Sequence, residues 1–231
     1  MKLATKLQGI LIMGLLAGAS APQTHADSDV LIVGDSIMQA VSRSLERALN
    51  KEAGLNATSY TAIGSGLARL DLFDWHAQLA TLMNERKPET VVIMMGANDN
   101  QPMRTENGII RFGEPGWNEE YARRAGEAMD IMIRGGATAI YWIELPDMRE
   151  ERLQLDVTVI NDVVKSEAEK RDEVTFQTSR GILSRKAGEY SPYIIQPNGM
   201  PLDIRSNDGV HLNRKGADHL VQALIKQIWA K

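Results

Sequence analysis

The chain has 231 residues, a formal net charge of -4 and 43% hydrophobic residues, which suits one α/β domain and leaves little room for two. Ordinary apolar content excludes an intrinsically disordered chain, and no dense cluster of Lys and Arg suggests nucleic acid as a partner. The sequence contains no cysteine, which excludes a lipoprotein anchor, disulfides, thiol catalysis and cysteine-based metal sites.

Residues 1–26 predict a secretory signal peptide. Two lysines precede an apolar run and then small residues, and the run is too short for a stable membrane span. Cleavage after Ala26 is preferred to cleavage after Ala21, because the latter would leave Pro22 first. The expected mature protein begins at Asp27 and is periplasmic or secreted from a bacterium, and a retained N-terminal anchor is the alternative.

Apolar, β-branched runs alternate with helical patterns along the rest of the chain. Strands are expected at residues 29–33, 57–62, 90–95, 138–144 and 173–178. Helical patterns cover residues 36–54, 74–88, 117–136, 149–171 and 213–231. Because strands alternate with helices and the runs lack polar alternation, the sequence predicts an α/β fold with a parallel sheet and helices on both faces. Two long segments, 100–116 and 180–206, are expected to be functional loops or hairpins.

Serine, glycine and asparagine residues follow the first three predicted strands. Ser36 ends a Gly-Asp-Ser turn, and by itself it is either a residue of a helix cap or a nucleophile. After the second strand, Gly64 or Gly66 leaves room for a backbone N–H group to face a ligand. After the third, the amide of Asn98 is a neutral donor suited to an oxyanion.

An Asp-x-x-His pattern precedes the last predicted helix. Asp208 and His211 are three residues apart, so they can meet across one turn, where the carboxylate orients the imidazole and leaves Nε2 as a base. The other histidines after residue 26, His76 and His219, fall within helical patterns. Without cysteine or a His-x-x-x-His spacing, no metal site is expected. Ser36 thereby gains a candidate base and a group that orients it.

These motifs, in the order Gly-Asp-Ser, Gly, Gly-x-Asn-Asp and Asp-x-x-His, resemble the SGNH (GDSL-like) hydrolase superfamily over essentially the whole mature chain. The resemblance implies a three-layer α/β/α sandwich, flavodoxin-like, around a parallel sheet of about five strands, and it implies no cofactor. The residues that it assigns to catalysis are Ser36, Asp208 and His211, and those that it assigns to the oxyanion hole are Ser36, Gly66 and Asn98. Gly66 is preferred to Gly64 because it follows a serine.

The resemblance implies acyl-ester chemistry, since members of the superfamily include esterases, lipases, thioesterases, carbohydrate deacetylases and O-acyltransferases. The segment "SGLARLDLFDWHAQL" and the export signal are most like bacterial envelope members. We therefore expect a serine esterase that forms an acyl-enzyme and acts on O-acyl groups of an envelope carbohydrate. The alternatives are a periplasmic O-acyltransferase for a polysaccharide or glucan, a non-catalytic glycan-binding module, and a partner of a membrane acyltransferase. A monomer is expected.

Four side chains near the predicted strand ends are candidate substrate contacts. They are Arg69, Trp75, Arg104 and Trp117. Arginine and aromatic side chains suit the face of a sugar or an anionic acyl group. Arg124, by contrast, is expected on a solvated face of a helix.

Overall fold

A five-stranded parallel sheet lies at the centre of the computed structural model, which describes residues 29–184, 186 and 188–229. The strands are β1 (Asp29–Gly34), β2 (Asn56–Thr61), β3 (Thr90–Met94), β6 (Ala139–Ile143) and β7 (Val174–Gln177). They pair in the order β2-β1-β3-β6-β7, and every neighbouring pair is parallel. The five predicted strands are confirmed, whereas the signal peptide predicted at 1–26 lies outside the described residues.

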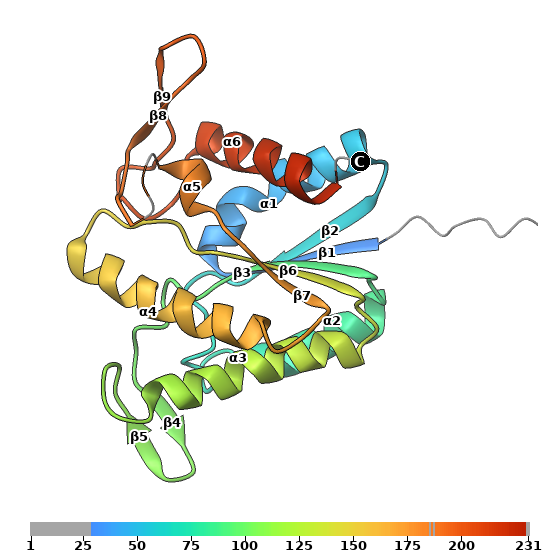
Figure 1. Ribbon diagram of the computed structural model, residues 1–231. Coiled ribbons are helices and arrows are strands. Elements are labelled where there is room, and N and C mark those ends of the chain that lie inside the picture. Colours follow the sequence, from blue (N-terminus) through green and yellow to red (C-terminus); the bar gives the residue numbers. More distant parts are fainter. Residues whose placement is uncertain (1–28, 185, 187, 230–231) are drawn as a thin grey trace, which may run out of the picture.

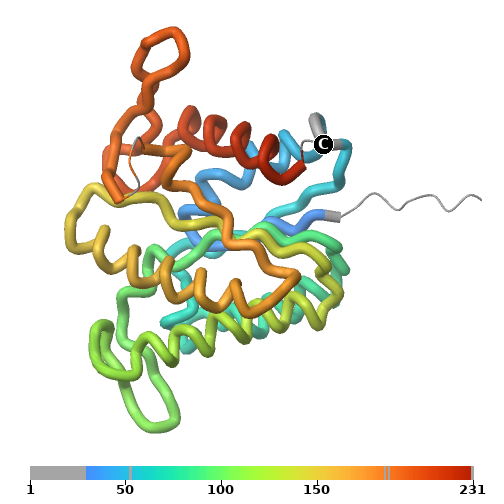
Figure 2. Tube along the Cα trace, viewed as in Figure 1, coloured from blue at the N-terminus to red at the C-terminus, as the bar shows by residue number. Residues whose placement is uncertain are grey.

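Helices cover both faces of the sheet, as the sequence predicts. They are α1 (Ser36–Ala48), α2 (Trp75–Arg86), α3 (Trp117–Arg134), α4 (Glu151–Ala168), α5 (Arg180–Leu183) and α6 (Arg214–Leu224), with π-helical turns η1 (Leu49–Ala53) and η2 (Ile225–Trp229). Figure 1 shows α1 and α6 on one face and α2, α3 and α4 on the other. The architecture is therefore a three-layer α/β/α sandwich, and the trace in Figure 2 follows the crossovers between its layers. Within the described part of the chain, no helix combines the length and the apolar character that a membrane crossing requires.

Helix α1 illustrates how the sequence determines these elements. Ile37, Val41 and Leu45 recur at helical spacing and are fully buried against the sheet. The side chain of Asp35 caps the first turn, and the segment ends at Gly54, which adopts the left-handed conformation at φ 66°. Both signals are typical of helix ends, so α1 begins directly where β1 ends.

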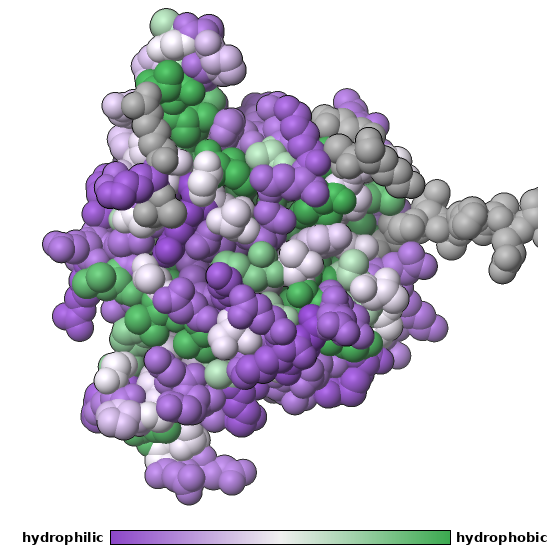
Figure 3. Space-filling view, viewed as in Figure 1, coloured by the Kyte–Doolittle hydropathy of each residue, from purple (hydrophilic) through white to green (hydrophobic). Residues whose placement is uncertain are grey.

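The two long segments each contain a hairpin. The hairpins are formed by β4 (Met103–Thr105) with β5 (Gly108–Ile110), and by β8 (Tyr193–Ile195) with β9 (Pro201–Asp203). Both project from the body of the molecule in Figure 1. Figure 3 shows apolar side chains gathered on the β8–β9 hairpin, where Tyr193 and Met200 are exposed.

The strand order places three loops side by side. Strand β1 lies between β2 and β3, so the loops that leave the carboxyl ends of these three strands meet at one edge of the sheet. In parallel α/β sheets this edge is where ligands bind. Ser36, Gly66 and Asn98 all lie on these loops or at the helix start that follows.

Candidate active site

Ser36 is the first residue of α1 and is half-buried at the carboxyl end of β1. Glycine at position 34 lets the end of β1 approach β3 closely, since a Cβ atom there would lie 2.0 Å from the carbonyl oxygen of Met94. The backbone N–H of Ser36 has no acceptor within the described residues, as expected at the first position of a helix. The serine hydroxyl and a free N–H at the positive end of the helix dipole therefore lie together.

The buried carboxylate of Asp35 holds this turn in place. Its Oδ1 accepts a hydrogen bond from the N–H of Ile37 at 2.8 Å, and its Oδ2 accepts from Gly96 at 3.0 Å and Ala97 at 3.3 Å. Burial raises the pKa of Asp35 to about 6, against the opposing effect of these backbone donors. Asp35 thus joins the start of α1 to the loop after β3.

Ser36, His211 and Asp208 form one chain of hydrogen bonds. The Nε2 of His211 lies 2.8 Å from the Oγ of Ser36, although the two residues are 175 positions apart. The Nδ1 of the same ring lies 2.8 Å from the Oδ2 of Asp208. These are the distances that a serine, its base and the group that orients the base require. The side chain of His211 is 32% exposed, so the site is open to solvent.

A tight turn holds Asp208 in position. Its Oδ1 accepts hydrogen bonds from the backbone N–H groups of Val210 at 2.8 Å and His211 at 3.0 Å. Partial burial raises the pKa of Asp208, but these bonds and the bond to the imidazole outweigh it and lower the pKa to about 2. Asp208 is therefore an anion at neutral pH, and its charge faces the His211 ring.

The glycine loop after β2 is anchored through Ser65. Its hydroxyl donates to the carbonyl of Ala62 at 2.6 Å and accepts from the Nε1 of Trp75 at 2.9 Å. Gly66 is buried, and its N–H has no acceptor within the described part of the chain. Gly64, by contrast, is exposed, with open space around its Cα. Of the two glycines, Gly66 is the one held in the interior beside the site.

The loop after β3 is bound to this glycine loop by two side chains. Asn98 donates one hydrogen of its Nδ2 to the carbonyl of Ser65 at 3.1 Å, which leaves the second hydrogen free. The buried carboxylate of Asp99 accepts from the N–H groups of Leu67 and Ala68, both at 2.9 Å. The free donors of Ser36, Gly66 and Asn98 are thus carried by three loops bonded to one another.

The structure corrects two of the four candidate substrate contacts. Trp75 and Trp117 are both completely buried. The Nε1 of Trp75 is bonded to Ser65, and that of Trp117 donates to the carbonyl of Gln101 at 3.0 Å. Trp117 also stacks on Tyr121 with ring centroids 4.9 Å apart. Each indole packs in the core and forms a hydrogen bond to a loop residue, so neither faces a substrate.

The arginines differ in what they contact. Arg69 forms a bidentate ion pair with Asp71 at 2.8 and 3.0 Å, and Arg104 is exposed on the β4–β5 hairpin. Arg124 does not lie on a solvated face, because its guanidinium is buried and donates to the carbonyls of Leu67 and Ala68 at 3.0 and 2.9 Å. Arg124 therefore fixes the exit of the glycine loop.

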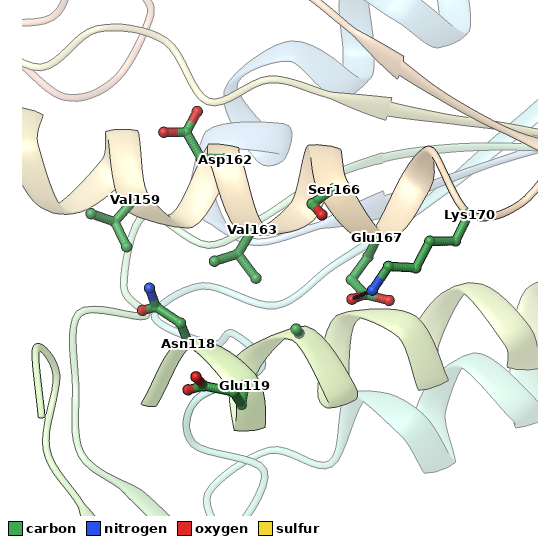
Figure 4. Close-up of a pocket in the computed structure, with 9 residues that line it drawn as sticks. Asn118, Glu119, Val159, Asp162, Val163, Ser166, Glu167 and Lys170 are labelled. Carbon is green, nitrogen blue, oxygen red and sulfur yellow. Dashed lines mark hydrogen bonds and ion pairs between the residues drawn. The ribbon is translucent and has the colours of Figure 1, made fainter. Parts of the chain in front are cut away.

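The described residues contain no group of three or more His, Asp or Glu side chains arranged to hold a metal ion. A groove of about 440 Å³ lies between α3 and α4, where Val159 and Val163 point toward Asn118 and Glu119 (Figure 4). None of the residues of the candidate site lines this groove.

Sequence reasoning missed the buried residues that support the site. Asp99 accepts from the hydroxyl of Tyr121 at 2.8 Å in addition to its two backbone donors. Arg205, also buried, donates to the carbonyls of Asp147 at 2.7 Å and Val210 at 3.2 Å. A carboxylate directly after a candidate oxyanion residue could have indicated the role of Asp99, whereas no local pattern distinguishes Arg205.

Comparison with known proteins agrees with this architecture. A family model described as "Protein of unknown function (DUF459)" matches residues 29–227. No curated protein matches the chain. A provisionally assigned platelet activating factor from Streptococcus pneumonia has a similar structure, with a TM-score of 0.57 at 14% identity over 90% of this chain and 87% of that one.

Two other solved structures are similar over most of the chain. A carbohydrate esterase has a TM-score of 0.55 at 14% identity, over 89% of this chain and 69% of that one. The salicylyl-acyltransferase SsfX3 of a tetracycline biosynthetic pathway has a TM-score of 0.50 at 12% identity, over 89% of this chain and 55% of that one. At these identities the likeness concerns the fold, and it confirms the α/β/α sandwich that the resemblance to SGNH hydrolases implied.

Proposed function

Because the chain belongs to the DUF459 family and has the fold of the SGNH hydrolases, we propose that it is a serine esterase that forms an acyl-enzyme. The hydrogen-bonded chain from Ser36 through His211 to Asp208 is the observation that carries this proposal. Structural neighbours that include a carbohydrate esterase and an acyltransferase support chemistry on acyl esters.

In the proposed reaction, Ser36 is the nucleophile. Its Oγ attacks the ester carbonyl carbon while its proton passes to the Nε2 of His211. Asp208 keeps the other ring proton on Nδ1 and stabilises the imidazolium that forms. The bond to the alcohol oxygen then breaks, and the proton on Nε2 goes to that oxygen as the alcohol leaves. Water then attacks the carbonyl carbon of the acyl-enzyme and passes a proton to His211. The bond to the Oγ of Ser36 breaks, the proton returns to that oxygen, and the acid is released.

The negative charge that develops on the carbonyl oxygen needs donors that are already in place. The free N–H groups of Ser36 and Gly66 and the second amide hydrogen of Asn98 are proposed to supply them. Because the surrounding loops are bonded to one another through buried carboxylates, these donors need little rearrangement when the charge appears. Removal of one such donor typically costs about 3 kcal/mol of transition-state stabilisation.

The proposed substrate is an O-acylated carbohydrate of the bacterial envelope. An open site, in which the side chain of Asp208 is 47% exposed, admits a bulky alcohol. The same acyl-enzyme would serve transfer if a carbohydrate hydroxyl replaced water. Product analysis with an acyl donor and a glycan acceptor distinguishes these outcomes, since transfer gives an acylated glycan and hydrolysis gives only the free acid.

Turnover of p-nitrophenyl acetate tests the proposed activity. The wild-type protein is expected to release p-nitrophenol, and Ser36→Ala is expected to reduce the rate to the background. Ser42→Ala is the matched control, because Ser42 lies in the same helix and, among the described residues, its hydroxyl bonds only to the carbonyl of Gln39. Equal rates in wild type and Ser36→Ala would contradict the proposal and favour a non-catalytic binding module.

A further inference from the structure

Arg149 is held against the turn that carries Asp208 and His211. It lies in the loop between β6 and α4, and its backbone N–H donates to the carbonyl of Gly209 at 3.0 Å. Arg205 joins the same two segments, because its guanidinium donates to the carbonyls of Asp147 and Val210. The loop and the turn therefore form one packed unit.

The side chain of Arg149 lies across Gly209. A Cβ atom placed on Gly209 would lie 2.5 Å from the Cβ, 2.6 Å from the Nε and 2.8 Å from the Cζ of Arg149. Gly209 also has φ at 76°, which favours glycine there. The guanidinium is consequently positioned beside the turn by its stem, although the residue as a whole is exposed.

Among the described residues, none forms an ion pair with the side chain of Arg149. Its guanidinium has neither a hydrogen bond nor an ion pair to any residue that the structure describes. Asp208 precedes Gly209 in the chain, but its oxygens already accept from Val210 and from His211. Arg69, in contrast, is engaged by Asp71. An arginine that packs against the turn and has no ion-pair partner among the described residues suits recognition of a carboxylate or phosphate.

The proposed reaction indicates which part of the substrate Arg149 would meet. His211 must deliver its proton to the oxygen of the leaving alcohol, so the alcohol portion of the ester lies over the turn that carries His211. The guanidinium lies on that same turn. It is therefore placed to contact the alcohol portion of the ester.

We propose that Arg149 is a specificity-determining residue that binds an anionic group, a carboxylate or phosphate, on the alcohol portion of the ester. The inference rests on the proposed function. It narrows the substrate class to esters of acidic alcohols, such as an acylated carbohydrate that carries a carboxylate or a phosphate.

Two esters that differ in one charge test the inference. They are 4-acetoxybenzoate, whose leaving phenol carries a carboxylate, and its neutral methyl ester. The quantity compared is the ratio of kcat/KM for the charged ester to kcat/KM for the neutral ester. Arg149→Gln is expected to lower this ratio about tenfold, mainly through KM, because one charge-assisted contact is lost. Arg149→Lys is expected to retain part of the ratio.

Arg152→Gln is the matched control, since Arg152 is an exposed arginine on α4. It is expected to leave kcat/KM unchanged for both esters. An unchanged ratio in Arg149→Gln, or an equal loss for both esters, would overturn the inference. If wild type hydrolysed neither ester, the proposed function would fail instead.

Binding provides a readout that does not depend on turnover. Titration of the Ser36→Ala protein with 4-hydroxybenzoate, followed by NMR, is expected to give about tenfold weaker binding when Arg149→Gln is added. Methyl 4-hydroxybenzoate is the neutral control and is expected to bind both proteins alike. Equal affinities of the two proteins for 4-hydroxybenzoate would contradict the role of Arg149 whatever the enzyme assay shows.

Discussion

The carboxylate of Asp99 occupies the space where a side chain on Gly66 would have to be. A Cβ on Gly66 would lie 2.0 Å from the Oδ1 of Asp99, and the same carboxylate accepts hydrogen bonds from Leu67 and Ala68. Glycine at this position lets the buried side chain of Asp99 accept hydrogen bonds from the backbone of the glycine loop. The loop after β2 thereby takes its shape from the loop after β3.

Substitution of the two glycines of this loop should therefore have different effects. Gly66→Ala is expected to displace Asp99, to lower the free energy of unfolding by about 2 kcal/mol and to reduce kcat for ester hydrolysis. Gly64→Ala meets no atom within 4 Å, so only the backbone strain of its positive φ, about 1 kcal/mol, is expected, with activity retained. Urea unfolding and the p-nitrophenyl acetate assay measure both quantities. If Gly64→Ala lost activity and Gly66→Ala did not, Gly64 and not Gly66 would be the functional glycine.

Removal of the Tyr121 hydroxyl should destabilise the protein through Asp99. The hydroxyl donates to the Oδ2 of Asp99 at 2.8 Å in a fully buried site. Tyr121→Phe leaves that oxygen with fewer donors, so a loss of about 1–3 kcal/mol in the free energy of unfolding is expected. Tyr60→Phe, at a half-buried tyrosine, is the control and should change it by less than about 0.5 kcal/mol. Equal effects of the two substitutions would contradict this account of Asp99.

Asp208→Asn tests the orientation of the imidazole. Asparagine can still accept the backbone hydrogen bonds that Asp208 receives from Val210 and His211, so the fold should persist. Its amide lacks the charge that stabilises the imidazolium and favours the wrong ring tautomer, so kcat is expected to fall by a factor on the order of 10³–10⁴. Steady-state kinetics alongside thermal unfolding separate the two effects. Full activity in Asp208→Asn would remove Asp208 from the mechanism.

Two aspartates of the site should titrate on opposite sides of the usual value of 3.8. Carbon-13 NMR is expected to give a pKa of about 6 for Asp35, raised by burial, and about 2 for Asp208, where hydrogen bonds outweigh partial burial. The protonated form of Asp35 stabilises the fold fully below pH 3.8, and this contribution is lost as the pH rises through 6. The contribution of Asp208 has the opposite sign, since it is present above pH 3.8 and lost as the pH falls through 2. A midpoint near 4 for both residues would contradict the described environments.

The sequence predicts the five strands of the sheet and the edge at which three of the candidate residues meet, and it does so for a local reason. Apolar runs without alternation mark buried parallel strands, and the turn after each run brings Ser36, Gly66 and Asn98 to one edge of the sheet. The spacing of Asp208 and His211 likewise fixes a contact within one turn. These features depend on neighbours in the chain, so they can be read from the sequence.

The features that the sequence does not predict depend on contacts between distant residues. Helical spacing shows that Trp117 lies on a helix, but not whether its face meets the core or the crevice, and it lies in the core. Arg124 pairs with Glu120 four residues earlier, as a surface helix would, yet its other bonds reach Leu67 and Ala68. The placement of Arg149 over Gly209 joins segments 60 residues apart, and no local pattern indicates it.

Covalent labelling of Ser36 tests the proposal that this serine is the nucleophile most directly. A fluorophosphonate that reacts with activated serines should modify one residue, Ser36, as located by mass spectrometry of the digested protein. Labelling should disappear in Ser36→Ala. The rate of labelling should fall strongly in His211→Ala, because the proposed base, whose Nε2 lies 2.8 Å from the Oγ of Ser36, is then absent. A label on a different serine, or equal labelling of wild type and Ser36→Ala, would contradict the assignment of Ser36 as the nucleophile.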